Sequence, residues 1–172
     1  MVDEQILIQR IKAGDQDAFR DIFERYRNQV YRFCLFVLGD EDLAKDIYQE
    51  TFIAFYQACR QGTTPRNVRN YILTAARNRS INYLKSRAVY QPLQSIEPSR
   101  YEMATDEFEF RDQIQMALSQ IPYQYRESFL LFELWGYSYE EIANQLQISL
   151  HTVKNRIYRA RIALRKVLSP IQ

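Results

Sequence analysis

Four polar side chains near the C-terminus combine an amide, a phenol and two cations. They are Lys154, Asn155, Tyr158 and Arg159. At about 3.6 residues per turn they share one side of a helix. The opposite side of the same helix carries the apolar residues Val153, Ile157, Ala160 and Leu164. The polar mixture can hydrogen-bond to base edges as well as to phosphates, so the segment predicts a DNA-reading helix whose apolar side is core.

The residues before this helix carry the signals of a helix-turn-helix. Ser138, followed three residues later by Glu141, forms a capping box that starts one helix. After a turn at Gln147, Ser149 can cap the DNA-reading helix. In such motifs the second helix enters the major groove. Residues 138–161 therefore predict a helix-turn-helix that presents the polar face to DNA.

Acidic and basic residues are segregated along the chain, although the formal net charge is only +2. No Asp or Glu occurs between Glu50 and Glu97, and none follows Glu141. The basic residues of these two stretches include Arg60, Arg66, Arg69, Arg77, Arg79, Lys85, Arg87, Lys154, Arg156, Arg159, Arg161, Arg165 and Lys166. One basic block alone can be a solvated helix face. Two blocks together favour binding to a nucleic-acid backbone.

The sequence lacks the residue clusters of common enzymes and metal sites. His151, Cys34 and Cys59 are too few for a zinc site, and there is no glycine-rich phosphate loop and no nucleophile with its base. We therefore expect no catalytic residue, metal, cofactor or small-molecule substrate. The N-terminus lacks signal-peptide features, and no apolar run is long enough to span a membrane. These features predict a cytoplasmic protein without membrane insertion.

Helical spacing of apolar residues dominates the N-terminal half. The pattern predicts a short helix that stops at Gly14 and a longer one that ends at Gly39. A third helix is expected from 40 to about 60, and a fourth segment breaks near Asn78. With only 4 Gly and 5 Pro in the chain, there is little room for the turns of a β fold. The first unit is therefore expected to contain four or five helices.

Between residues 91 and 110 the helical period fades, Pro92 and Pro98 interrupt the chain, and acidic residues accumulate. This composition is typical of a flexible acidic linker. A new helical pattern begins near residue 111. The sequence thus predicts an all-α protein of two small helical domains, 1–90 and 111–172, joined by the linker 91–110.

The predicted helix from 40 to 60 has two distinct sides. Asp46, Gln49, Glu50 and Ile53 share one side. Leu43, Ile47, Ala54 and Ala58 share another, which is expected to face the core. The acidic side suits a basic partner, although an ordinary solvated surface has the same pattern. In the basic segment that follows, aromatic and amide side chains alternate with cations, as single-stranded DNA binding requires.

Three segments of the chain resemble bacterial sigma factors. Residues 136–146 (GYSYEEIANQL) and 152–161 (TVKNRIYRAR) look like region four. Residues 46–52 (DIYQETF) resemble the polymerase-binding motif of region two, and residues 71–84 (YILTAARNRSINYL) resemble its promoter-melting segment. Two domains without regions one and three are the layout of the extracytoplasmic-function (ECF) group. The resemblance covers roughly residues 5 to 168.

The resemblance implies partners and site residues: an ECF sigma factor binds core RNA polymerase, directs it to promoter DNA, and is held by an anti-sigma factor. The implied polymerase contacts are Asp46, Gln49, Glu50 and Phe52. The implied contacts to the minus-ten element are Arg77, Asn78, Arg79, Asn82 and Lys85, with a flipped base in the loop 59–67. The implied contacts to the minus-thirty-five element are Thr152, Lys154, Asn155, Arg156, Tyr158 and Arg159.

Some positions depart from the family pattern, and other protein classes need to be weighed. Tyr48 stands where a smaller or aliphatic residue is usual, Gln147 replaces a common turn glycine, and residues 150–151 replace a Val-Gly pair. The main alternative is a helix-turn-helix activator or repressor that binds an operator without polymerase. A response-regulator output domain would lack the motif at 46–52. An enzyme is the third class, and no residue cluster supports it.

Overall fold

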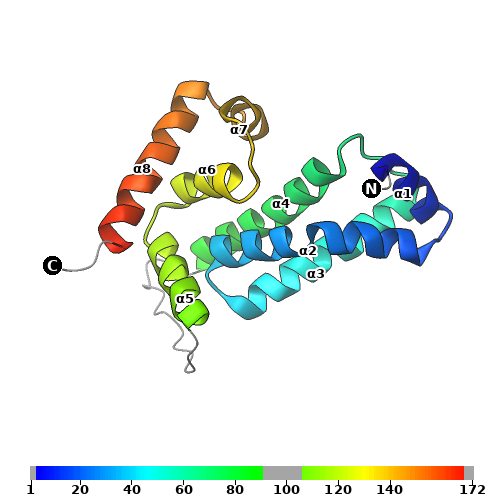
Figure 1. Ribbon diagram of the computed structural model, residues 1–172, viewed down its shortest axis with the longest axis horizontal. Coiled ribbons are helices and arrows are strands. Elements are labelled where there is room, and N and C mark those ends of the chain that lie inside the picture. The colour runs from blue at the N-terminus through cyan, green and yellow to red at the C-terminus, as the bar shows by residue number, and fades with distance from the viewer. Residues whose placement is uncertain (1–2, 91–105, 169–172) are drawn as a thin grey trace. The chain divides into compact units, whose positions relative to one another are not determined.

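The computed structural model describes residues 3–90 and 106–168, apart from the side chains of 88–90, 106–111 and 167. All regular elements in these residues are α-helices (Figure 1), which confirms the predicted all-α class. The chain divides into two compact units, Met1–Ser95 and Ile96–Gln172. Most of the predicted linker, 91–105, lies outside the described residues. Helix α5 begins at Asp106, inside the range expected for the linker.

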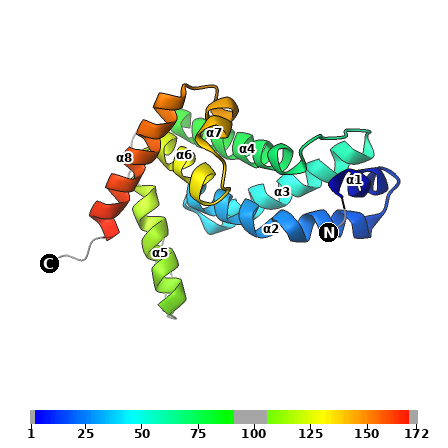
Figure 2. The same cartoon turned by 45° about the horizontal axis from the view of Figure 1, so that its top comes forward.

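The first unit consists of α1 (Glu4–Lys12), α2 (Gln16–Leu38), α3 (Glu41–Arg60) and α4 (Val68–Tyr90). Helix α2 packs against the other three, and it runs beside α3 and α4 in both views (Figures 1 and 2). Its start is capped by Asp15, which accepts hydrogen bonds from the backbone of Asp17 and Ala18. Its end is Gly39, whose left-handed φ of 71° stops the helix as predicted.

The core side of α3 differs from the predicted one. Its buried residues are Ala44, Ile47, Thr51, Phe52, Phe55 and Cys59, whereas Leu43, Ala54 and Ala58 are only half-buried. The large rings of Phe52 and Phe55 bury more apolar area than the alanines, and they set which side faces inward. Thr51 is tolerated there because its hydroxyl donates to the backbone oxygen of Ile47 at 2.7 Å. Only Ile47 belongs to both the predicted and the observed side.

Helix α4 is continuous, so the expected break near Asn78 was wrong. Ile72, Leu73, Ala76 and Ser80 are fully buried and hold the helix against the bundle on both sides of Asn78. The Ser80 hydroxyl donates to the Ala76 oxygen at 2.9 Å. Packing of this buried side outweighs the weak helix propensity of one exposed asparagine.

The second unit consists of α5 (Asp106–Ser119), α6 (Tyr123–Glu133), α7 (Tyr139–Leu146) and α8 (Leu150–Leu168). Helix α8 packs against the other three around the buried Trp135 and Leu131. The predicted capping box is present: the Ser138 hydroxyl accepts from the Glu141 amide at 3.1 Å, and the Glu141 carboxylate accepts from the Ser138 amide at 2.8 Å. Helices α7 and α8 therefore form the expected helix-turn-helix.

The turn between α7 and α8 contains a strained residue. Gln147 has a φ of 55° and is the one non-glycine residue with positive φ in the described part of the chain. Its side-chain amide donates to the Asn144 oxygen at 2.7 Å, which offsets part of the cost. A residue with a Cβ loses about 1–2 kcal/mol in this conformation, whereas glycine adopts it freely.

We expect Gln147→Gly to raise the free energy of unfolding of the second unit by about 0.5–1 kcal/mol. Trp135, the single tryptophan of the sequence, is 1% exposed and reports on this unit by fluorescence during urea unfolding. Gln147→Ala is the control, because it keeps the strain and loses the amide. A glycine variant no more stable than the alanine variant would show that the turn is not strained.

Candidate nucleic-acid and protein interfaces

The polar face of α8 is formed as the sequence predicts. Lys154, Asn155, Tyr158 and Arg159 are exposed, and Thr152 and Arg156 beside them are half-buried. Beneath them Val153, Ile157, Ala160 and Leu164 are at most 9% exposed. The helix begins at the Ser149 hydroxyl, which accepts from the Thr152 amide at 3.1 Å. The packed side fixes the rotation of α8, so the six polar residues lie together at the surface.

One of these side chains is oriented by a neighbour on α6. The Arg159 guanidinium lies 5.9 Å from the ring centre of Tyr125, and its Nη1 is 3.4 Å from the tyrosine oxygen. A cation over a phenol ring is attracted by the electrons of the ring face. The sequence did not point to Tyr125, because the pair depends on how α6 packs against α8.

Arg161 on the same helix is engaged within the unit. Its Nη2 lies 2.8 Å from the Glu133 carboxylate, and its guanidinium lies over the ring of Phe132 at 5.3 Å. The hydrogen bond to Glu133 raises the pKa of Arg161. Arg161 therefore ties α8 to α6, while Arg159 is exposed on the polar face of α8.

The acidic side of α3 is a surface feature. Asp46, Gln49 and Glu50 are exposed, and Ile53 on the same side is 56% exposed. Protein interfaces combine an apolar centre with a polar rim, and Ile53 with its polar neighbours offers both kinds of surface. We call these four residues the α3 face. Sequence reasoning noted Ile53 on this side but did not include it in the site.

Phe52 is not part of the α3 face. It is only 2% exposed, and its ring centre lies 4.9 Å from the ring centre of Phe23 and 5.4 Å from that of Tyr48. The family resemblance implies a direct polymerase contact for Phe52, but its side chain is buried within the first unit. Tyr48 in turn packs edge-on against Tyr31, so the unusual aromatic at this position fills a cluster between α2 and α3. Phe52 therefore supports the α3 face from below.

Helix α4 carries a stripe of exposed polar side chains. Asn78, Asn82 and Lys85 lie on one side at helical spacing, and all three are exposed. Arg77 and Arg79 are half-buried on either flank of the stripe. Arg79 donates to the Ala75 oxygen at 3.3 Å. The structure thus brings two amides and one cation together, with an arginine on each side.

The loop between α3 and α4, residues 61–67, is held at its C-terminal end. Pro65 is buried, and the Asn67 side chain accepts from the Asn70 amide at 2.8 Å, which caps α4. The Gln5 side chain on α1 donates to the backbone oxygens of Pro65 and Arg66, at 3.0 and 3.3 Å. Sequence reasoning missed Gln5, which is 60 residues away from Pro65.

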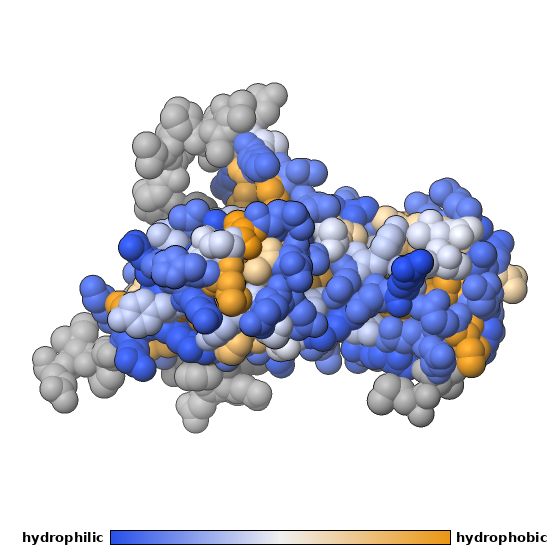
Figure 3. Space-filling model, turned by 90° about the horizontal axis from the view of Figure 1, so that it is seen from above, coloured by the Kyte–Doolittle hydropathy of each residue, from blue (hydrophilic) through white to orange (hydrophobic). Residues whose placement is uncertain are grey.

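The described residues carry neither a metal cluster nor a membrane helix. Within 3–90 and 106–168, no group of His, Cys, Asp and Glu side chains is arranged to hold a metal, and no helix is long and apolar enough to cross a membrane. Hydrophilic side chains cover most of the face in Figure 3.

Cys34 and Cys59 are fully buried, and burial raises the pKa of the Cys34 thiol to about 12.

Two solved structures share the fold of this chain. The structure of CnrH in complex with the cytosolic domain of CnrY matches with a TM-score of 0.71 at 22% identity, covering 99% of this chain and 100% of that one. The sigma factor RpoE of Bartonella quintana, in complex with the anti-sigma factor NepR, matches with a TM-score of 0.69 at 21% identity, covering 90% and 98%. At these identities the likeness establishes the fold.

Sequence comparisons establish the family. The model of Sigma-70 region 2 matches residues 22–89, and that of Sigma-70, region 4 matches residues 111–164. The ECF RNA polymerase sigma factor SigW of Bacillus subtilis is 31% identical over 94% of each chain. The RNA polymerase sigma-H factor of Pseudomonas aeruginosa is 29% identical over 98% of this chain and 95% of its own. The chain belongs to the ECF group of RNA polymerase sigma factors, which direct RNA polymerase to promoters and start transcription there.

Proposed function

We propose that the three polar surfaces divide the work of promoter recognition. The α3 face binds core RNA polymerase, the α4 stripe captures unpaired bases of the minus-ten element, and the polar face of α8 holds duplex DNA at the minus-thirty-five element. The observation that supports this most is the position of the α4 stripe and the α8 face on separate compact units. Each unit can therefore bind one element of a bipartite promoter.

The α3 face suits a basic protein surface. Two carboxylates, Asp46 and Glu50, would steer a basic partner, and the apolar Ile53, about one turn beyond Glu50 on the same side, would be covered on binding. Buried apolar contacts at the centre of a charged rim slow dissociation. Phe52 contributes indirectly, because its packing against Phe23 fixes the rotation of α3.

The α4 stripe suits single-stranded DNA. Asparagine amides donate and accept at once, so Asn78 and Asn82 can hydrogen-bond to the exposed edges of unpaired bases. Lys85 and the flanking arginines would neutralise the backbone. Contacts that exist only with unpaired bases offset the cost of local unpairing. Binding and melting would thus be one event.

The polar face of α8 suits a major groove, and two substitutions test it. We expect Asn155→Ala or Arg159→Ala to weaken binding to the upstream element by about 5- to 100-fold, because each base contact contributes about 1–3 kcal/mol. Arg165 is an exposed cation on the same helix, so Arg165→Ala is the control. It should lose only affinity that does not depend on the DNA sequence. Gel-shift assays of holoenzyme on promoters with an intact or a scrambled upstream element measure this. If scrambling the upstream element weakens binding equally for wild type and variants, the polar face of α8 does not read that element.

We also propose that an anti-sigma factor controls this protein. The sigma factor of Bartonella quintana was solved in complex with its anti-sigma factor NepR. An inhibitor that covers the α3 face, together with the polymerase-binding surface of the second unit, would block polymerase binding. Since the proposed work is done on polymerase and promoter DNA, we place the protein in the cytoplasm and assign it no catalytic activity of its own.

The decisive experiment is run-off transcription with purified core polymerase on a library of genomic fragments. We expect specific transcripts only when core polymerase and this protein are both present. A conventional helix-turn-helix regulator would instead bind its operator without core polymerase. If the protein neither associates with core nor starts specific transcripts, the proposed function is wrong.

A further inference from the structure

We propose that α1 is a brace for the loop 61–67, and that Gln5 is a positioning residue for base capture at the minus-ten element. The inference rests on the proposed function of α4 and its preceding loop. Helix α1 lies outside residues 22–89, which the region 2 family model matches. The family match therefore gives it no role.

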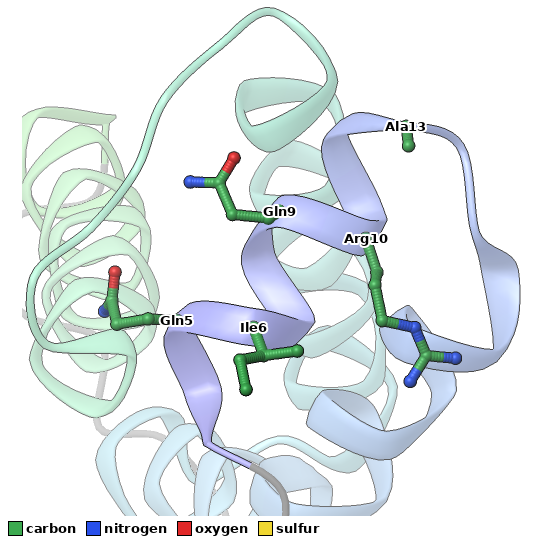
Figure 4. Close-up of a pocket in the computed structure, with 5 residues that line it drawn as sticks. All are labelled: Gln5, Ile6, Gln9, Arg10 and Ala13. Carbon is green, nitrogen blue, oxygen red and sulfur yellow. The ribbon is translucent and has the colours of Figure 1, made fainter.

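The C-terminal end of the loop is fixed by Gln5. Its Nε2 donates to two successive backbone oxygens, those of Pro65 at 3.0 Å and Arg66 at 3.3 Å. The next residue, Asn67, caps α4. One side chain on α1 thus holds the chain at the point where it enters the α4 helix (Figure 4).

The N-terminal end of the loop is also tied to α1. Arg60, the last residue of α3, donates from Nη1 to the Lys12 oxygen at 2.9 Å and so satisfies a carbonyl at the end of α1. Gly14 leaves room for it, because a Cβ there would lie 2.8 Å from the same Nη1. Both ends of the loop are therefore bonded to one helix.

Helix α1 is itself firmly anchored. Leu7, Ile8 and Ile11 are fully buried, and the Glu4 carboxylate accepts hydrogen bonds from Arg25 at 2.9 Å and from Tyr26. A loop held by a rigid support loses less conformational freedom when it takes up a ligand. The brace would thus favour capture of the correct base without touching DNA.

The chain offers a matched control for Gln5. Gln9 lies one turn further along α1, is exposed like Gln5, and makes no side-chain hydrogen bond among the described residues. Both side chains line the open depression along α1 that Figure 4 shows. Gln5→Ala removes the donor, Gln5→Glu places a carboxylate against two carbonyl oxygens, and Gln9→Ala changes a glutamine that does not hold the loop.

The test uses full-length protein with core polymerase on a promoter and on variants substituted at each minus-ten position. We expect Gln5→Ala to lower the preference for the favoured base by about 3- to 10-fold at the position that the loop captures, as loss of about one hydrogen bond predicts. Gln5→Glu should lower it further. Gln9→Ala should leave it unchanged, and core affinity should be equal in all variants.

Hydrogen exchange of the loop amides, those of residues 61–64, 66 and 67, provides a second measurement without polymerase or DNA. The rates should rise in Gln5→Ala and stay unchanged in Gln9→Ala. Unchanged base preference and unchanged exchange in Gln5→Ala would overturn the brace, and so would an equal loss at every promoter position. If wild type shows no minus-ten preference at all, the proposed function fails, while the exchange rates still show whether α1 holds the loop.

Discussion

Replacing Asn78 and Asn82 together by alanine is expected to reduce promoter opening by about 100-fold or more. Each amide would contribute about 1–3 kcal/mol through a base edge that only the unpaired strand exposes. Both side chains are exposed on α4, and alanine is a better helix former, so the fold should be unaffected. The substitutions would thus destabilise the complex with melted promoter DNA and not the folded protein.

Permanganate reactivity of unpaired thymines in the minus-ten element measures this opening directly. Asn28→Ala is the matched control, since Asn28 is an exposed asparagine on another helix, α2. It should open the promoter as wild type does. The double variant should still bind core polymerase and the upstream element with wild-type affinity. Normal opening by the double variant would refute the assignment of these amides to the minus-ten element.

The helix-turn-helix could be predicted in detail because its signals are local. The Ser138 and Glu141 capping box joins residues three positions apart, and the buried side of α8 repeats with the helical period. Such features depend on a few neighbours along the chain. The same holds for the stop at Gly39, which ends α2.

Features that depend on packing between helices could not be predicted. The inward side of α3 was misplaced because the ring of Phe52 finds its partner, Phe23, on another helix. The break expected at Asn78 is absent because buried neighbours on both sides hold α4 together. Sequence periodicity describes one helix at a time, and it does not say which partner rings will meet.

Long-range side-chain contacts were the most difficult to predict. Tyr125 and Arg159 are 34 residues apart in sequence, and Gln5 and Pro65 are 60 apart. Neither pair belongs to a motif or a periodic pattern. Both connect a proposed DNA-binding element to a neighbouring helix, so the residues that support the site are found only in the folded chain.

Asp46→Lys is expected to weaken binding to core polymerase by about 100-fold. Reversing a charge at an interface replaces an attraction with a repulsion, and the loss of one partner in a close charge pair costs about 2–5 kcal/mol. Asp46 is exposed on α3 and lies outside the core, so the substitution should not unfold the first unit. Fluorescence anisotropy of labelled protein with core polymerase measures the affinity.

Asp21→Lys makes the same change of charge on the exposed surface of α2 and separates a local contact from a change in net charge. It should weaken binding no more than about 3-fold, and less at high salt, because distant surface charges are screened. Equal losses in the two variants would show that the α3 face has no specific role.

Ile53→Ala distinguishes the apolar part of the α3 face from its charges. Ile53 is 56% exposed, and truncating it removes apolar area that only a bound partner would cover. We expect about a 10-fold loss of core affinity, expressed mainly as faster dissociation and with an unchanged dependence on salt. Asp46→Lys should instead slow association and reduce the salt dependence. An interface made by charge alone would leave Ile53→Ala at wild-type affinity. The two variants together therefore show whether the α3 face binds polymerase through apolar contacts as well as charge, or through charge alone.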